Sequence, residues 1–381
     1  MTSLANMRNL GRMTRAGFGI MRGMLYYPAA WFGWFKPRDE LAKAVAELLL
    51  IGFYGASATS SSARLLALQV RRGEVGAVFF VTQNIGTADQ VKELLDLFRS
   101  EGNTSLLAID HEGGVVQRLT KAHGFTRIPA ALEVASSMSL DEARTLYALA
   151  GRELAQRGFN INLGPVLDVY EPGNPAIGKS RRAYGTDPER IASYGQAFVE
   201  GFTSAGVLCA AKHFPGHGLA VSDSHDDTAD ITATWTEDEL EPYIRLLASP
   251  NVPDIIMTGH LRLDTVAPDG RPATVSKPIV SGLLRQKLGY NGVIATDDLD
   301  MGAVSQFMNR REAFVQALVA GNDLIMIKNL FGYDPLLPRR AVGWVRAAIK
   351  QGVLTEAQVM ASAERVRAIR RKAHQSVDSV K

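Results

Sequence analysis

The segment Lys212–His225 concentrates side chains that can carry protons. It reads KHFPGHGLAVSDSH and contains three of the seven histidines of the chain. Pro215, Gly216 and Gly218 rule out a helix, because proline lacks a backbone donor and glycine loses too much conformational entropy in a helix. The segment is therefore predicted to be a loop, either a solvated connection or a loop placed to do chemistry.

Asp223 and His225 are the pair in this loop whose spacing best suits proton transfer. In an extended chain, residues two positions apart project to the same side. A carboxylate beside an imidazole fixes the tautomer of the ring and raises its basicity. Such a dyad can give a proton to a leaving oxygen and later take one from water. The alternative is an acidic surface patch with an incidental histidine.

Asp297 ends an apolar run, in the sequence VIATDDLDM. A carboxylate that attacks an anomeric carbon needs rigid placement and hydrogen-bond donors that keep it ionised, and the end of a strand offers the rigidity. In retaining glycosidases such a nucleophile works with a separate acid/base group. The alternative is a structural carboxylate that caps the next helix, a role that Asp298 or Asp300 could equally take.

Cationic side chains near these carboxylates would suit a ligand rich in hydroxyl groups. Carboxylates accept hydrogen bonds from hydroxyls, while guanidinium and ammonium groups donate to them. The candidates are Arg118, Arg182 and Lys212, and the alternative for each is an ordinary exposed cation. A zinc site is a further alternative, with His213, His217, His225, His260 and Asp223 as its ligands. We expect no metal or other cofactor, because no helix can join His213 to His217 and the chain has no H-E-x-x-H motif.

Eight short apolar runs, separated by longer amphipathic segments, must position these residues. The runs cover residues 48–55, 76–84, 105–114, 159–169, 206–216, 254–260, 292–299 and 323–329. Segments such as 141–158 and 187–206 have helical periodicity, and apolar strands that alternate with helices indicate a parallel sheet covered on both faces. Eight such units predict an α/β fold, a single (β/α)8 TIM-type barrel with C-terminal helices. An open doubly wound sheet is the alternative, but no nucleotide-binding glycine motif follows a run.

Polar side chains gather at one end of these runs. They are Asp110, His111, Glu112, Asp168, Lys212, His213, His260, Asp297, Asp298, Lys328 and Asn329. In a barrel the carboxyl ends of all eight strands open on one face, and that face holds the active site. We therefore expect Asp110 and Asp297 to face one another, with the loop Lys212–His225 overhanging the same mouth.

The composition is that of an ordinary globular protein except at the N-terminus. Residues 1–36 carry five basic residues, no acidic residue and an aromatic-rich run from Leu25 to Phe35, whereas the rest of the chain has 37 basic and 39 acidic residues. The body is therefore not a basic nucleic-acid binder. The run is too short to span a bilayer and lacks a clean signal-cleavage site. We expect residues 1–36 to lie outside the fold, as a disordered extension or in contact with an anionic membrane surface, and residues 37–381 to form one catalytic barrel.

Seven motifs occur in order along the chain: AIDHEGGVVQRL, NLGPVLDVY, RAYGTDPERI, AAKHFPGHG, DSH, IMTGHL and GVIATDDLDMGAV. Over roughly residues 41–373 they resemble the motifs of glycoside hydrolase family 3, specifically its single-domain β-N-acetylglucosaminidases. KHFPGHG followed five residues later by D-S-H is the most specific part. The resemblance implies a TIM-type barrel and a retaining β-N-acetylhexosaminidase, which removes terminal non-reducing β-linked N-acetylglucosamine from glycans such as peptidoglycan fragments.

The resemblance also implies roles for eight side chains. Asp297 would be the nucleophile, His225 the acid/base and Asp223 its dyad partner. The sugar-binding positions would be Asp110, Arg118, Arg182, Lys212 and His213. The chain departs from the family pattern at Val115, where the family has arginine, and at Leu219, where it commonly has aspartate. Neither departure falls on a position with an expected role, but both leave the sugar preference open.

The length of the chain supports an acid/base within the barrel. Relatives such as β-glucosidases take this group from a second α/β domain, whereas only about 50 residues follow the eighth run, too few for another domain. We expect Gly216 and Gly218 to let Asp223 and His225 swing over the substrate. Competing functions are a β-glucosidase or glycoside phosphorylase on the same barrel, a non-catalytic sugar-binding barrel and a metal hydrolase. We expect a carbohydrate substrate, no nucleic-acid partner and a cytoplasmic location, with the periplasm or a membrane surface as alternatives.

Overall fold

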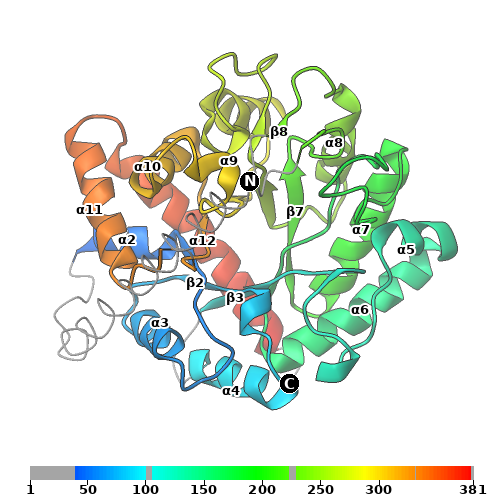
Figure 1. Ribbon diagram of the computed structural model, residues 1–381, viewed down its shortest axis with the longest axis horizontal. Coiled ribbons are helices and arrows are strands. Elements are labelled where there is room, and N and C mark those ends of the chain that lie inside the picture. The colour runs from blue at the N-terminus through cyan, green and yellow to red at the C-terminus, as the bar shows by residue number, and fades with distance from the viewer. Residues whose placement is uncertain (1–38, 100–104, 223–228, 331, 379–381) are drawn as a thin grey trace, which may run out of the picture.

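Eight parallel strands form one sheet in the computed structural model, which describes residues 39–99, 105–222, 229–330 and 332–378. The strands are β1 (Leu49–Ile51), β2 (Ala77–Phe80), β3 (Leu106–Ile109), β6 (Ile161–Asn162), β7 (Leu208–Phe214), β9 (Ile255–Thr258), β11 (Val293–Thr296) and β12 (Ile325–Ile327). They pair in the order β11-β9-β7-β6-β3-β2-β1-β12. An isolated parallel bridge between Ala295 and Leu324 joins the two ends, so the sheet closes into a barrel (Figure 1).

Each of the eight predicted runs contains one of these strands, and each strand pairs with the next one along the chain. Every residue within the eight strands is buried. Burial of both faces explains why the runs are continuously apolar rather than alternating. The predicted TIM-type barrel is confirmed.

Helices cover the outside of the barrel. They are α2 (Glu40–Glu47), α3 (Ser61–Arg71), α4 (Ala88–Phe98), α6 (Leu140–Arg157), α7 (Pro188–Ser204), α8 (Glu241–Leu247), a π-helix over Pro278–Lys287, α10 (Arg310–Ala320), α11 (Leu337–Lys350) and α12 (Glu356–Asp378). Local sequence fixes their ends: the Ser139 hydroxyl accepts from a backbone N–H of the first turn of α6, and Gly158 ends that helix at φ +102°. The expected C-terminal helices are α11 and α12.

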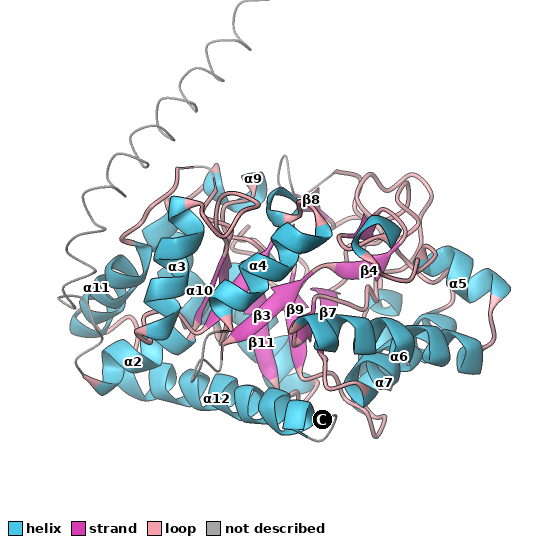
Figure 2. Cartoon of the chain, turned by 90° about the horizontal axis from the view of Figure 1, so that it is seen from below, coloured by secondary structure: helices cyan, strands magenta, loops and turns pink. Residues whose placement is uncertain are grey.

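Short elements occupy the loops at the mouth of the barrel. They are β4 (His111–Gly113), β5 (Val116–Gln117), α5 (Ala131–Ser137), β8 (Ala229–Asp230), β10 (Leu261–Arg262), α9 (Gly302–Ser305) and four 3₁₀ turns at Thr82–Asn84, Lys121–His123, Glu237–Glu239 and Ala273–Val275. β4 and β5 form a hairpin directly after β3. Figure 2 shows α12 running along the face opposite β4, β8 and α9. The two ends of the barrel therefore differ: loops form one end, and a long helix closes the other.

Asp323, just before β12, fastens α12 to the barrel. Its carboxylate is fully buried, and Oδ1 accepts from Ser362 Oγ at 2.7 Å and from Arg365 Nη2 at 2.8 Å. Oδ2 accepts from the Ile294 backbone N–H at 2.9 Å and pairs with the guanidinium of Arg285. One carboxylate thus joins β11, β12, the π-helix and α12.

The predicted boundary between residues 36 and 37 stays a prediction, because residues 1–38 lie outside the described part of the chain. Membrane contact through residues 1–36 also stays a prediction for this reason. The cytoplasmic location stays a prediction as well. In the ranges that the structure describes, no helix is both long enough and apolar enough to cross a membrane.

Replacing Asp323 with asparagine should lower the free energy of unfolding by about 3–5 kcal/mol, because two arginines lose their buried counter-charge. Urea unfolding followed by circular dichroism measures this. The control is Lys372→Met, which removes the half-exposed lysine of the Lys372–Asp254 pair and should cost less than about 1 kcal/mol. Equal, small losses in both variants would show that Asp323 does not anchor the helix.

Candidate active site

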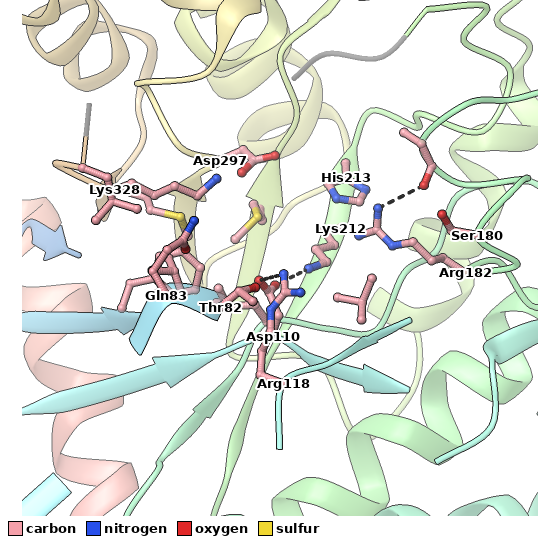
Figure 3. Close-up of a pocket in the computed structure, with 18 of the residues that line it drawn as sticks. Thr82, Gln83, Asp110, Arg118, Ser180, Arg182, Lys212, His213, Asp297 and Lys328 are labelled. Atoms are coloured by element: carbon pink, nitrogen blue, oxygen red, sulfur yellow. Dashed lines mark hydrogen bonds and ion pairs between the residues drawn. The ribbon is translucent and has the colours of Figure 1, made fainter. Parts of the chain in front are cut away.

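A cavity of about 400 Å³ opens at the carboxyl ends of the barrel strands (Figure 3). This volume lies within the usual range of small-molecule sites. Six of the residues predicted from the sequence line it: Asp110, Arg118, Arg182, Lys212, His213 and Asp297. The predicted dyad, Asp223 and His225, lies outside the described residues.

Asp110, at the end of β3, holds two cations in place. Its Oδ1 lies 3.0 Å from Lys212 Nζ and its Oδ2 lies 3.0 Å from Arg118 Nη2. Burial alone would raise the pKa of the Asp110 carboxyl, but the Lys212 ammonium and the Arg118 guanidinium hold it well below its ordinary value. The carboxylate is thus kept ionised at the cavity wall, where it can accept hydrogen bonds from hydroxyl groups.

Glu112 belongs to the same network, although sequence reasoning gave it no role. Its Oε2 accepts from Arg182 Nε at 2.8 Å and its Oε1 from Arg182 Nη2 at 2.7 Å, a bidentate pair. Lys212 Nζ lies 2.7 Å from the same Oε1. Burial would lower the pKa of Lys212, but Asp110 and Glu112 raise it above its ordinary value. The position of Glu112 at the end of the third apolar run was the available signal.

Asp168, which follows the fourth strand and is fully buried, orients His213. Its Oδ2 lies 2.7 Å from Nδ1 of the ring, and its Oδ1 accepts from the backbone N–H groups of His213 and His217 at 3.1 and 2.8 Å. Burial would raise the pKa of Asp168, but His213 lowers it below its ordinary value. With Nδ1 donating to this carboxylate, Nε2 of His213 is the ring nitrogen left for the cavity.

Asp297 faces the cavity from the end of β11. Its backbone N–H donates to the Thr258 carbonyl at 3.0 Å, which ties it to the end of β9. Its Oδ1 accepts from the Asp298 N–H at 2.7 Å. The side chain is therefore held both by the strand and by a backbone donor.

The two neighbouring aspartates have structural partners, but neither caps the next helix, because α9 has Met301 at its N-cap and no side-chain cap hydrogen bond. Asp298 Oδ1 accepts from the backbone N–H groups of Lys328 at 2.8 Å and Asp300 at 3.2 Å. Asp300 pairs with Arg310 at 2.8 Å. Burial, and then the Asp300 carboxylate, raise the pKa of Asp298.

The wall opposite Arg182 is formed by side chains that sequence reasoning left without a role. Thr82 and Gln83 come from the 3₁₀ turn after β2, and Lys328 comes from the end of β12 (Figure 3). Lys328 was recognisable as a strand-end cation. The 3₁₀ turn carries no motif that would have identified Thr82 or Gln83.

The base of the loop after β7 is fastened by two buried side chains. Nδ2 of Asn174 shares its two hydrogens among three carbonyl oxygens, those of His217, Gly218 and Ala220, at 2.8, 2.9 and 3.0 Å. Oε1 of Glu239 accepts from the Leu219 N–H at 2.9 Å. Burial, and then the Asp168 carboxylate, raise the pKa of Glu239. This part of the loop is packed rather than solvated.

Gly216 and Gly218 are needed for close packing. A Cβ atom at Gly218 would lie 1.8 Å from the carbonyl oxygen of Val169, and one at Gly216 would lie 2.5 Å from Cβ of Glu239. Gly216 also has φ +120°. Both glycines are buried against neighbouring chain, and that they let the loop swing stays a prediction.

The described histidines of the zinc alternative have other partners. His213 contacts Asp168, and His260 Nε2 donates to the Asp298 carbonyl at 2.9 Å. Among residues 39–99, 105–222, 229–330 and 332–378, no group of three or more His, Cys, Asp or Glu is placed to hold a metal ion. His225 and Asp223 lie outside these ranges, so the absence of a metal stays a prediction.

Gly218→Ala should reduce the free energy of unfolding by about 2 kcal/mol, since the added methyl group forces the packed loop away from Val169. The matched control is Gly343→Ala on α11, where nothing lies within 4 Å of the added Cβ. That change should stabilise the protein by up to about 1 kcal/mol, because alanine favours a helix interior. Urea unfolding compares the two, and a neutral Gly218→Ala would mean that the loop base can yield.

Comparisons with curated sequences identify the family. The chain matches the model of the glycosyl hydrolase family 3 N-terminal domain over residues 41–369. A beta-hexosaminidase of Tolumonas auensis is 34% identical over 266 residues, which cover 68% of this chain and 77% of the relative. A beta-hexosaminidase of Pseudomonas aeruginosa (strain LESB58) is 34% identical over 264 residues, with the same coverage of both chains.

Solved structures agree with the sequence match. A family 3 beta-N-acetylglucosaminidase from Paenibacillus sp. str. FPU-7 has a TM-score of 0.78 at 34% identity, covering 90% of this chain and 64% of its own. This chain therefore spans slightly less than two thirds of that protein. A beta-N-acetylhexosaminidase from Beutenbergia cavernae has a TM-score of 0.75 at 29% identity, covering 88% of this chain and 99% of its own. The resemblance seen in the sequence motifs is confirmed, and the chain belongs to glycosyl hydrolase family 3.

Proposed function

We propose that the protein is a retaining β-N-acetylhexosaminidase, which removes β-linked N-acetylglucosamine from the non-reducing end of glycans such as peptidoglycan fragments. The observation that carries the proposal is the carboxylate of Asp297, held at a strand end and facing a cavity lined with paired acids and bases. The names of the relatives from Tolumonas, Pseudomonas, Paenibacillus and Beutenbergia support the same activity.

The charge pairing in the cavity suits a neutral sugar. Arg118 and Lys212 are paired with Asp110, and Arg182 is paired with Glu112. Each of these three cations contacts at least one of the two carboxylates, so most of their charge is compensated and they can offer hydrogen bonds to hydroxyl groups. Sugar hydroxyls, which both donate and accept, fit such mixed pairs. His213 would add a further contact through its second ring nitrogen.

The first half of the proposed reaction forms a covalent intermediate. An oxygen of the Asp297 carboxylate attacks the anomeric carbon, and the bond from that carbon to the leaving oxygen breaks. The leaving oxygen takes the electron pair of that bond and a proton from His225. Asp223 would hold the His225 ring in the required tautomer.

The second half returns the enzyme to its starting state. A water oxygen attacks the anomeric carbon and gives a proton to His225. The ester bond to Asp297 breaks, and its electron pair returns to the carboxylate. Two displacements at one carbon retain its configuration.

An assay with aryl β-glycosides tests the function. We expect aryl β-N-acetylglucosaminide to be cleaved faster than aryl β-glucoside, with no effect of EDTA or phosphate. A 5-fluoro-N-acetylglucosaminyl fluoride should then label Asp297, as read by peptide mass spectrometry, and Asp297→Ala should take no label. Faster glucoside cleavage, phosphate-dependent turnover or loss of activity with EDTA would favour the competing functions. A label elsewhere, or an inverted product by NMR, would exclude the nucleophile.

His225→Ala should slow substrates in proportion to how much their leaving group needs a proton. A poor leaving group should lose about 10²–10⁴-fold in rate, whereas glycosylation by a dinitrophenyl glycoside should change little. Hydrolysis of the intermediate should then limit turnover of the dinitrophenyl glycoside, so the leaving group should be released in a burst. Azide should speed the breakdown of the intermediate and give a β-glycosyl azide as product. Asp223→Ala should show the same pattern more weakly. Equal slowing of all substrates, without burst or azide product, would make His225 a binding residue.

A further inference from the structure

Lys328 places a cation near the carboxylate of Asp297, at the ends of neighbouring strands. The bridge between Ala295 and Leu324 brings β11 and β12 side by side. Both side chains line the same cavity, and Figure 3 shows the Lys328 side chain extending toward Asp297. Lys328 and Arg182 lie at opposite ends of the cavity, so the lysine is remote from the Glu112 pair.

The position of Lys328 is fixed by its backbone and by Asp298. Its N–H donates to Asp298 Oδ1 at 2.8 Å, and its Nζ lies 3.4 Å from Asp298 Oδ2. The backbone just after β1 packs against it, since a Cβ atom at Gly52 would lie 2.5 Å from the Lys328 carbonyl oxygen. Asp298 also donates its N–H to Asp297 Oδ1. The lysine and the proposed nucleophile are therefore both tied to one residue.

Lys328 keeps its charge in this setting. Its side chain is 26% exposed. Burial would lower the pKa of the ammonium, but Asp298, Asp297 and Asp110 raise it above its ordinary value. Because the group is partly withdrawn from water, its field at Asp297 is screened less than that of a surface lysine.

The other charged groups that line the cavity with Asp297 are already engaged in pairs. Asp110 and Lys212 contact one another, Arg118 contacts Asp110, and His213 contacts Asp168. Lys328 is paired only with Asp298 among the ion pairs of the described residues, at a distance longer than those in the Asp110 network. Its charge is thus the one best placed to respond to a change of charge on Asp297.

We propose that Lys328 acts through Asp297 and has opposite effects on the two halves of the reaction, opposing formation of the glycosyl–Asp297 ester and favouring its hydrolysis. The inference rests on the proposed function. When Asp297 attacks, it loses its negative charge while positive charge grows on the sugar, so a nearby cation stabilises the free enzyme more than the transition state. When the ester breaks, the carboxylate reappears, and the same cation stabilises that transition state.

Replacing Lys328 with methionine, which preserves the unbranched shape and removes the charge, tests the inference. With a dinitrophenyl β-N-acetylglucosaminide we expect hydrolysis of the intermediate to slow on the order of tenfold, equivalent to ~1.4 kcal/mol. KM should fall together with kcat, and kcat/KM should stay unchanged or rise. Stopped-flow mixing should show a burst, and intact-protein mass spectrometry should show accumulated glycosyl-enzyme.

Lys328→Arg is the matched control, because it keeps the charge and should behave like the wild type. Lys328→Gln replaces the methionine variant if that variant does not fold. Equal losses in kcat and kcat/KM, or a Lys328→Arg enzyme as impaired as Lys328→Met, would overturn the inference and leave a structural role. A wild-type enzyme that forms no Asp297 adduct would overturn the proposed function and this inference with it. An adduct that forms and hydrolyses at unchanged rates in Lys328→Met would overturn this inference alone.

Discussion

The ammonium group of Lys212 is held between two carboxylates at the centre of the barrel mouth, 3.0 Å from Asp110 and 2.7 Å from Glu112. Transferring three such charges out of water is costly, and their mutual attraction offsets that cost only when the geometry is good and the remaining lone pairs are satisfied. Arg118 and Arg182 supply the remaining donors, one on each carboxylate. The five side chains form one network, in which Asp110 is the carboxylate that Arg118 contacts and Glu112 the one that Arg182 contacts, while Lys212 joins the two pairs.

The loops around the mouth hold the members of this network in place. Glu112 reaches Lys212 because β4 turns back on β5 immediately after β3. Arg182 must be held by the loop after the fourth strand, and its Nη1 donates to the Ala176 carbonyl of that loop at 3.3 Å. Asn174 in the same loop bonds the base of the loop after β7. The loop that holds Arg182 and the loop that carries the proposed acid/base are thus joined by one buried amide.

The barrel and most of its mouth could be predicted from the sequence for a physical reason. Strands buried on both faces are mostly apolar, so a polar residue such as Asp110 or Asp297 directly after such a run marks the open end of the barrel. Glu112 also follows an apolar run closely. Its partner Arg182, however, lies 70 positions further along the chain, and no local sequence pattern predicts a contact over that separation. The close packing at Gly218 could not be predicted, because a glycine that allows close approach and one that allows motion are identical in sequence. The role of Lys328 could not be predicted from its position either. What a cation at a strand end does depends on which carboxylate lies at the end of the neighbouring strand, and the sequence does not give that arrangement.

The central claim is that Asp297 bonds the anomeric carbon while the paired acids and bases of the mouth hold the hydroxyls of the sugar. A crystal structure of the enzyme trapped with a 5-fluoro-N-acetylglucosaminyl fluoride tests both parts at once. The account predicts an ester bond between Asp297 and the anomeric carbon, with sugar hydroxyls within hydrogen-bond distance of Asp110 and Lys212. A sugar bonded to another residue, or one bound at the mouth without contact to the Asp110–Lys212 pair, would contradict it.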